Sequence, residues 1–290
     1  MGMQNKGMAT LSSIIERINI NGGQESISIQ LSVINNPDGS ERWLYPSASK
    51  KPRFLAFYNV TSLKSKIYHL AVKLLFKLNF SFIVRNRKLV VNIDKTSVLG
   101  LVISKHGLNF SIFTGTAGDN RKILVEFGNQ GNTVGFIKVA FGENSGSLIQ
   151  NEQSTLNWLN TLELTRVIAP SILGAGDGYL EISNIAPKDK VVSVNALSSK
   201  HIWAASEYHR VDMKPVHWCE VDALIFTDRL VLLKACKAGS AIDDILEEYI
   251  DLLIKIRQLI GKEPILHCGV THGDFTPWNL YLTDNKLHLY

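Results

Sequence analysis

Residues 272–279 of this chain read His-Gly-Asp-Phe-Thr-Pro-Trp-Asn. The stretch follows a long apolar segment and precedes alternating apolar residues, so we expect a tight loop between a helix and a hairpin. On such a loop Asp274 and Asn279 can point at one spot from two sides. The carboxylate can accept a hydrogen bond from a substrate hydroxyl, and the amide oxygen can ligate a divalent metal on nucleotide phosphates. The stretch therefore predicts phosphoryl transfer, with a chance turn as the alternative, because Gly, Asp, Pro and Asn also favour turns.

The same eight residues resemble the catalytic loop of the aminoglycoside phosphotransferase and choline kinase group of kinase-like enzymes. In that group His-Gly-Asp-x-x-x-x-Asn replaces the His-Arg-Asp version of protein kinases. Asp274 and Asn279 match the motif residue by residue, which implies Asp274 as the catalytic base and Asn279 as a metal ligand. The resemblance covers roughly residues 106–290. It implies an α+β, protein-kinase-like fold with an antiparallel-sheet N-lobe and a helical C-lobe, and it implies ATP and Mg²⁺ as cofactors.

Two short strands are expected after the motif, at 279–283 and 286–290, around the turn Asp284-Asn285. In the resembled family an Asp that ligates a second metal usually follows the second strand, and further helices then cover the lower lobe. The sequence given stops at Tyr290, which would leave apolar faces exposed. We therefore expect a C-terminally truncated fragment with an incomplete C-lobe. A natural pseudoenzyme is the alternative.

A kinase-like N-lobe must also supply a phosphate-covering hairpin, a strand lysine, a helix glutamate and a linker strand, in that order. The hairpin is expected at 109–127. Its loop contains Gly115 and Gly118, whose small size lets backbone amides approach phosphate oxygens. Most glycine-containing hairpins bind nothing, so this loop gains its value from its position in the chain.

Lys138 lies in an apolar strand expected at 134–140, and Glu152 lies near the start of a helix expected over 151–159. The resemblance implies that Lys138 holds the α- and β-phosphates and that Glu152 orients Lys138. The alternative is a solvated lysine on an edge strand and a glutamate stabilised by the helix dipole.

The linker is expected in a hairpin formed by 170–178 and 179–187. Backbone groups around Glu181 to Ser183 would then meet the edge of the adenine, with an ordinary edge strand as the alternative. Further along, residues 241–260 carry an apolar stripe with helical spacing, which predicts a core helix of the lower lobe.

The first hundred residues differ in charge from the rest. Residues 42–93 contain eleven Lys or Arg and no Asp or Glu, whereas the whole chain has 31 basic and 26 acidic residues. The net charge of +5 is thus a window of +11 joined to a remainder of −6. We expect three domains: a basic α+β domain at 1–105, a kinase-like N-lobe at 106–185 and the incomplete start of a C-lobe at 186–290.

Within this window, residues 66–78 have the pattern of a basic amphipathic helix, with apolar residues at 67, 70, 71, 74, 75 and 78. One interpretation is peripheral contact of residues 64–78 with an anionic membrane. The other is a helix that packs this stripe on its own domain and keeps its lysines in water. Residues 42–58 mix aromatic and basic residues, which suits sugars or phosphates. Nucleic acid is not expected as a partner because no recognised reader motif is present.

Composition supports a folded protein, since 45% of the residues are apolar and 20% are charged. The first six residues lack an apolar signal core, and the three cysteines are widely spaced, so we expect a cytoplasmic protein. If residues 64–78 contact a membrane, the protein would be peripheral at the inner membrane surface. The segment 42–58 resembles segments ahead of phosphotransferase domains in proteins of bacterial surface-glycan clusters, which points to a lipid-linked or phosphorylated sugar as acceptor.

The resulting hypothesis is a Mg-ATP-dependent phosphotransferase that acts on a small-molecule or lipid-linked sugar hydroxyl in bacterial surface-glycan biosynthesis. The alternative is a non-catalytic kinase-like scaffold that binds a membrane or a glycan-assembly partner.

Overall fold

The computed structural model describes residues 11–19, 25–58, 60, 62–129, 132–187, 198–211, 213–218, 243–260, 265–268, 280–283 and 286–289. Contacts within the chain separate two units. The first contains Met1–Leu197 and Thr276–Tyr290, and the second contains Ser198–Phe275. Helices and antiparallel sheets occur together, which confirms the predicted α+β class.

The first unit begins with elements from the basic N-terminal segment. They are α1 (Leu11–Ile18), β1 (Ser26–Asn35), β2 (Glu41–Pro46), the 3₁₀ helix η1 (Arg53–Phe57), α2 (Leu63–Lys77), the 3₁₀ helix η2 (Ser81–Ile83), β3 (Arg87–Asp94) and α3 (Val98–His106). Serine side chains start two of these helices. Ser62 and Ser65 form a reciprocal capping box at α2, and Ser97 accepts from the Gly100 N–H at α3.

The rest of the first unit contains the elements in the order expected of a kinase-like N-lobe, followed by the hairpin predicted at 279–290. It contains β4 (Phe110–Phe113), β5 (Lys122–Asn129), β6 (Asn132–Ala140), α4 (Ser145–Leu159), β7 (Val167–Ile168), β8 (Ile172–Gly176) and β9 (Tyr179–Ser183), and later β12 (Leu280–Leu282) and β13 (Leu287–Leu289). The hairpins predicted at 109–127, 170–187 and 279–290 are all present as antiparallel strand pairs.

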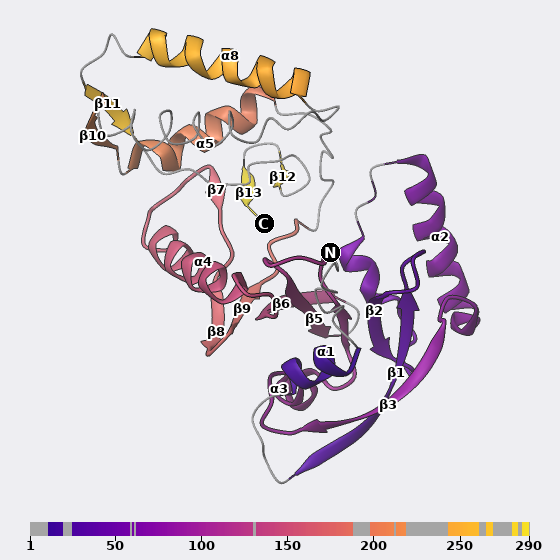
Figure 1. The fold of residues 1–290 in the computed structure, drawn as a ribbon. Coiled ribbons are helices and arrows are strands. Elements are labelled where there is room, and N and C mark those ends of the chain that lie inside the picture. Colours follow the sequence, from indigo (N-terminus) through magenta and orange to yellow (C-terminus); the bar gives the residue numbers. More distant parts are fainter. Residues whose placement is uncertain are drawn as a thin grey trace, which may run out of the picture. The chain divides into compact units, whose positions relative to one another are not determined.

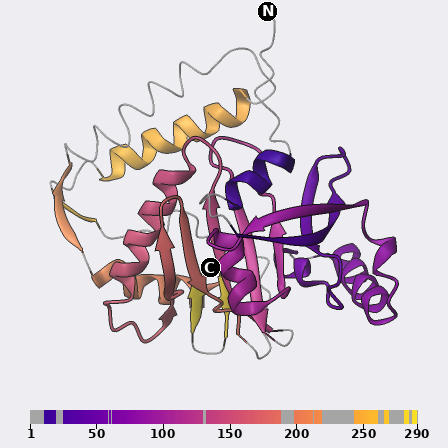
Figure 2. The same ribbon diagram turned by 90° about the horizontal axis from the view of Figure 1, so that it is seen from below.

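Within the described part of the chain, eight strands of the first unit form one sheet in the order β3-β1-β2-β4-β5-β6-β9-β8. Each neighbouring pair is antiparallel. Helix α4 contacts β6, β8 and β9, whereas α2 lies at the other end of the sheet, near β1 and β2 (Figure 1, Figure 2). The basic segment and the predicted N-lobe are therefore built on one continuous sheet.

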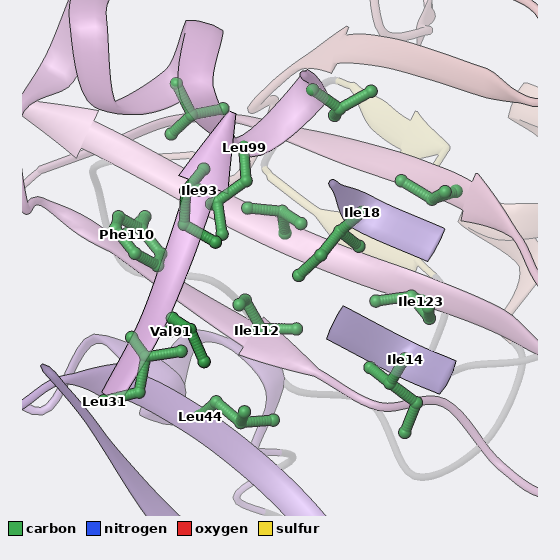
Figure 3. Close-up of a cluster of buried hydrophobic side chains, with 14 of the residues drawn as sticks. Ile14, Ile18, Leu31, Leu44, Val91, Ile93, Leu99, Phe110, Ile112 and Ile123 are labelled. Carbon is green, nitrogen blue, oxygen red and sulfur yellow. The ribbon is translucent and has the colours of Figure 1, made fainter. Parts of the chain in front are cut away.

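The main hydrophobic core covers one face of this sheet and combines both segments. Helices α1 and α3 contribute Ile14, Ile18 and Leu99, which meet side chains from β1 to β6 (Figure 3). Ile14, Ile18 and Leu99 have no exposed surface. Because one core serves residues on both sides of position 105, the expected domain boundary there does not coincide with a break in packing. The three-domain division stays a prediction.

The two halves of the sheet meet at β2 and β4 through a short ladder. Only two residue pairs are in register, Trp43 with Phe113 and Leu44 with Ile112. Thr114 extends the contact, since its N–H donates to the Arg42 carbonyl at 3.1 Å and its hydroxyl donates to the Glu41 carbonyl at 2.7 Å. A ladder this short needs support from side chains.

A buried ion pair beside this junction gives that support. Arg53 in η1 donates through Nε and Nη2 to both carboxylate oxygens of Glu126 in β5, at 3.0 and 2.5 Å. Ser111 and Thr133 donate to the same carboxylate at 3.2 and 2.8 Å. The two charged side chains are only 4% and 1% exposed. Such burial is tolerable because each charge is paired and further hydrogen-bonded.

Gly128 explains how Arg53 reaches this position. The register of β5 and β6 shifts between Phe127 and Gly128, and a Cβ at Gly128 would lie 2.1 Å from Arg53 Nη2 and 1.9 Å from the Asn132 carbonyl oxygen. A bulge of this kind re-aims the backbone. Only glycine leaves space there for the guanidinium, which also donates to the Asn132 carbonyl at 3.2 Å.

The hairpin of β12 and β13 also belongs to the first unit. β13 pairs in parallel with β7, through Leu287 with Val167 and His288 with Ile168. The buried imidazole of His288 places Nδ1 2.9 Å from the Ile185 carbonyl oxygen. A carbonyl has no proton, so Nδ1 must be the donor. Burial lowers the pKa of His288, the hydrogen bond to Ile185 opposes this, and nearby Lys286 lowers it further.

Helix α2 corrects one expectation. The predicted helix is present, but the apolar stripe does not pack on the domain, because Ile67, Leu70 and Leu74 are exposed. The helix instead turns Val72 and Phe76 inward, onto a second core with Trp43, Tyr45 and Phe54. The sequence pattern had two apolar faces, and the tertiary contacts select the aromatic-rich one.

The second unit contains α5 (Ser199–Val211), β10 (Lys214–His217), α8 (Asp243–Ile260) and β11 (Ile265–Cys268). β10 and β11 pair antiparallel, from Lys214 with Cys268 to His217 with Ile265. The helix predicted at 241–260 is present as α8, in which Ile250 is buried. Among the described residues of both units, no helix is long and apolar enough to span a membrane.

Removing one partner of the buried ion pair should cost far more than removing one partner of an exposed pair. We expect Arg53→Met to lower the free energy of unfolding by about 3–5 kcal/mol, because the buried Glu126 carboxyl would lose its cationic partner. The matched control is Arg87→Met, in the pair Arg87–Glu41 whose arginine side chain is 53% exposed; we expect a loss below about 1 kcal/mol. Urea denaturation followed by tryptophan fluorescence measures both. Equal losses in the two variants would show that the buried pair has no special role.

Lowering the pH should weaken the first unit through His288. A histidine with a lowered folded pKa is more easily protonated in the unfolded chain, so its contribution to stability is complete above the unfolded value of 6.5 and is lost as the pH falls below it. We expect the thermal midpoint to fall between about pH 7.5 and about pH 5.5. His288→Asn can still donate to Ile185 but does not titrate, so the decrease should be smaller in this variant. An identical decrease would assign the effect to other groups.

Candidate functional site

The predicted base Asp274 and the predicted metal ligand Asn279 lie outside the described residues. Their roles stay predictions. In the portions of the chain that the structure describes, no group of three or more His, Cys, Asp or Glu side chains is arranged to hold a metal ion. The described residues that were predicted to act in the site lie in the predicted N-lobe.

Lys138 lies on β6, between β5 and β9. The edge-strand alternative is thus wrong for this residue. Its Nζ donates to Oε1 of Glu152 on α4, and the Lys138 side chain is only 16% exposed. A lysine at an interior strand position needs an anionic partner, and Glu152 provides it. The structure brings together the two residues that the sequence paired.

Glu152 does not lie where the sequence placed it in its helix. Helix α4 starts at Ser145 rather than near residue 151, because the Ser145 hydroxyl accepts from the Phe141 N–H at 2.8 Å and closes the turn before the helix. Glu152 therefore sits two turns inside the helix, where the dipole of the N-terminus has little effect. The helix-dipole alternative for Glu152 is wrong, and its partners are lysines.

Lys122 is a second cation at this position, which sequence reasoning missed. Its Nζ lies 3.5 Å from Oε2 of Glu152. In the register of β5 and β6, Lys122 is opposite Ala140 and Leu124 is opposite Lys138. Residues two apart on a strand share a face, so Lys122 and Lys138 are diagonal neighbours. The sequence shows that Lys122 and Leu124 share a face of β5. Only the register of the hairpin shows that Lys138 lies on the same face of the sheet.

The loop between β4 and β5 is fixed at its base and exposed at its tip. Gly115 has φ +80°, and a Cβ there would lie 2.1 Å from the Lys122 carbonyl oxygen. Gly118 has φ +140°, with open space around it. Asp119 and Arg121 carbonyl oxygens accept from the N–H groups of Asn144 and Gly142, at 2.9 and 2.8 Å. At Gly115 a larger residue would clash with the Lys122 backbone, so glycine is required there for packing. At Gly118 no neighbouring atom covers the backbone where a side chain would stand.

The backbone around Glu181 and Ser183 is already paired. Glu181 is opposite Ile137 on one side of β9 and Gly174 on the other. The Ser183 N–H donates to the Ser171 carbonyl at 2.9 Å. The edge-strand alternative is wrong, since β9 is an interior strand. A nucleotide base could not accept from the Ser183 N–H unless the hydrogen bond to Ser171 broke. The backbone that follows β9 is therefore the better candidate for contact with the base.

The Glu181 side chain is directed away from Lys138. Adjacent positions on a strand point to opposite faces, and Lys138 is opposite Leu180 rather than Glu181. Glu181 instead borders a cavity of about 130 Å³ next to Val102 and Lys105 of α3. No part of the Lys138 cluster reaches this cavity.

The cluster of Lys122, Lys138 and Glu152 has two positive charges and one negative charge. The three side chains are 25%, 16% and 24% exposed, so they are partly dehydrated but still accessible. The carboxylate holds both ammonium groups close together and leaves one positive charge unbalanced. This arrangement suits an anion with closely spaced oxygens, such as a di- or triphosphate, and the ordering by Glu152 reduces the entropy lost on binding.

Comparisons with known proteins give a limited result. No protein-family model and no curated protein matches the chain. Among solved structures, the chain is similar to the gentamicin complex of APH(2″)-IIa, with a TM-score of 0.40 and 15% sequence identity over 69% of each chain. Similarity at this level carries no functional argument, so the proposal below rests on the residues of this chain.

Loss of either lysine should weaken the binding of a polyphosphate. We expect Lys138→Met to raise the dissociation constant for tripolyphosphate by about 10- to 100-fold, as for a charged hydrogen bond, and Lys122→Met to have a smaller effect because its contact with Glu152 is longer. Lys88→Met, on the exposed edge strand β3, is the control. Isothermal titration calorimetry would detect the difference. Equal affinities in all three variants would leave the cluster with a structural role alone.

Proposed function

We propose that this protein is a Mg-ATP-dependent phosphotransferase of the protein-kinase-like type. The observation that carries the proposal is the cluster of Lys122, Lys138 and Glu152 on β5, β6 and α4. A lysine on the third strand of an N-lobe, paired with a glutamate of the following helix, is the arrangement by which kinases hold nucleotide phosphates. The cluster also stands in the expected order relative to the glycine-containing loop 114–121.

In this proposal each part of the N-lobe has one task. Lys138 contacts the α- and β-phosphates, Glu152 orients Lys138, and Lys122 adds positive charge at the start of β5. The backbone near Gly118 approaches phosphate oxygens. The adenine contacts backbone that follows β9, in place of the paired groups of Glu181 and Ser183.

The chemical step needs the residues of the motif. Asp274 accepts a hydrogen bond from the acceptor hydroxyl, whose oxygen bonds to the γ-phosphorus while the bond from that phosphorus to the ADP oxygen breaks. The hydroxyl proton passes to Asp274 late in the step. Asn279 is the proposed magnesium ligand, and the metal when bound neutralises charge on the phosphates.

The proposed acceptor is the hydroxyl of a small molecule or of a lipid-linked sugar, and surface-glycan biosynthesis in the bacterial cytoplasm is the proposed setting. The support is the mixture of aromatic and basic residues at 42–58. The structure adds a restriction, because Trp43, Tyr45 and Phe54 from this segment are buried in the second core. These three rings serve packing, so an acceptor would have to use other residues.

The alternative is a non-catalytic scaffold that uses the same fold to bind a membrane or a glycan-assembly partner. In this alternative the Lys138–Glu152 pair is a structural contact only, and the protein does not hydrolyse or transfer phosphate from a nucleotide. Nucleotide consumption separates the two functions.

Replacing the proposed base should remove turnover and leave nucleotide binding nearly unchanged. We expect Asp274→Asn to lower the rate of ADP release, measured with pools of sugar and lipid-linked sugar acceptors, by about 10²- to 10⁴-fold. The dissociation constant for ATP should change by less than about threefold, because Asp274 is assigned to the acceptor. Asp177→Asn, in the exposed turn between β8 and β9, is the matched control. Undiminished turnover in Asp274→Asn would reject the assignment.

A further inference from the structure

Helix α2 and the 3₁₀ helix η2 carry a set of large apolar side chains that face solvent. Their exposed fractions lie between 46% and 74%, against a protein surface on which large apolar groups usually occur singly. The set consists of Leu63, Ile67, Leu70, Leu74 and Leu78 along α2 and its C-terminal end, and Phe80, Phe82 and Ile83 at η2. We call these eight residues the outer apolar surface.

The five members along α2 and its C-terminal end recur every three or four positions, so they form one stripe along the helix. The opposite side of α2 is already used, because Val72 and Phe76 pack in the second core and Tyr68 is half-buried against it. The stripe therefore cannot turn inward without removing these residues from the core. Figure 1 shows α2 at the end of the first unit, with only its inner side toward β1 and β2.

η2 extends the stripe past the end of the helix. α2 and η2 are in contact, and the rings of Phe80 and Phe82 pack edge to face with centroids 5.9 Å apart. Asn79 makes the turn between them, with φ +61°. Exposed phenylalanines stabilised by each other rather than by the core are costly in water and suit an apolar partner.

The charge around the outer apolar surface is positive. Lys66, Lys73 and Lys77 are exposed along one border of the stripe, and Lys64 lies on the other. No acid occurs between residues 42 and 93. Two acids flank this window: Glu41 is bound to Arg87 at 2.5 Å, and Asp94 accepts from the Thr96 N–H at 2.7 Å. Any partner must therefore accept apolar side chains at its centre and cations at its edge.

We propose that the outer apolar surface docks on an anionic lipid bilayer, with α2 parallel to the membrane plane. The leucines and the Phe80–Phe82 pair enter the boundary between headgroups and acyl chains, and the four lysines of α2 contact lipid phosphates. The inference goes beyond phosphotransfer and does not depend on it.

Charge complementarity favours a bilayer over two other occupants. A second copy of this chain would bring four lysines against four lysines without intervening acids, which opposes the pairing of two α2 stripes. A nucleic acid would neutralise the lysines but leave the leucines and phenylalanines without an apolar environment. A bilayer with acidic headgroups satisfies both requirements.

The test is co-sedimentation of the 290-residue chain with vesicles of phosphatidylcholine, with and without phosphatidylglycerol. We expect binding to the mixed vesicles that weakens with added salt, and little binding to phosphatidylcholine alone. Leu70→Ser/Leu74→Ser should weaken binding by at least about tenfold, because serine gains nothing from the acyl region. Leu252→Ser/Leu259→Ser, two exposed leucines of α8, is the matched control and should bind as the native chain does.

The charge contribution is tested separately. Lys66→Gln/Lys73→Gln should weaken binding by a factor of about 25, since each base near an anionic surface contributes a factor of about five. Binding to both vesicle types alike, or equal binding by the serine variant of α2 and its control, would overturn the proposal. So would a salt-dependent complex with oligonucleotides without vesicle binding, or a dimer that Leu70→Ser/Leu74→Ser dissociates. Asp274→Asn should bind vesicles normally, which separates this result from that of the phosphotransfer test.

Discussion

The buried pair of Arg53 and Glu126 joins the basic N-terminal segment to the strands that carry the candidate site. Two charges this deeply buried are tolerable when they are paired and further hydrogen-bonded, and here Ser111, Thr133 and the Asn132 carbonyl add hydrogen bonds to the pair. The backbone ladder between the two halves of the sheet is only two residue pairs long. The ion pair therefore supplies a geometric constraint that the main chain does not.

That constraint reaches the candidate site through the register of β5 and β6. The same ladder that opposes Glu126 to Phe136 also opposes Leu124 to Lys138, which places Lys122 and Lys138 on the face that receives Glu152. A slip of either strand by one residue would move its lysine to the face filled by Ile14, Ile18 and Leu99. The hydrophobic core on one face and the ion pairs on the other thus enforce the same register.

Helix α2 shows where sequence patterns are ambiguous. Its helical spacing was readable because apolar residues recur every three or four positions. Its orientation was not, because two faces of the helix are apolar. Val72 and Phe76 pack against the aromatic cluster of Trp43, Tyr45 and Phe54. The leucine stripe on the other side of the helix stays exposed, where the proposed bilayer would contact it.

The sequence by itself determined the α+β class, the order of hairpin, strand lysine, helix glutamate and second hairpin, and the pairing of Lys138 with Glu152, because these follow from local periodicity and from a known order of elements. The tertiary structure decided that residues on both sides of position 105 share one sheet and one core, that Lys122 joins the site, and that Glu181 faces away from Lys138. Each of these depends on strand register and on which faces are covered. Such contacts join residues far apart in the chain, so no local pattern encodes them.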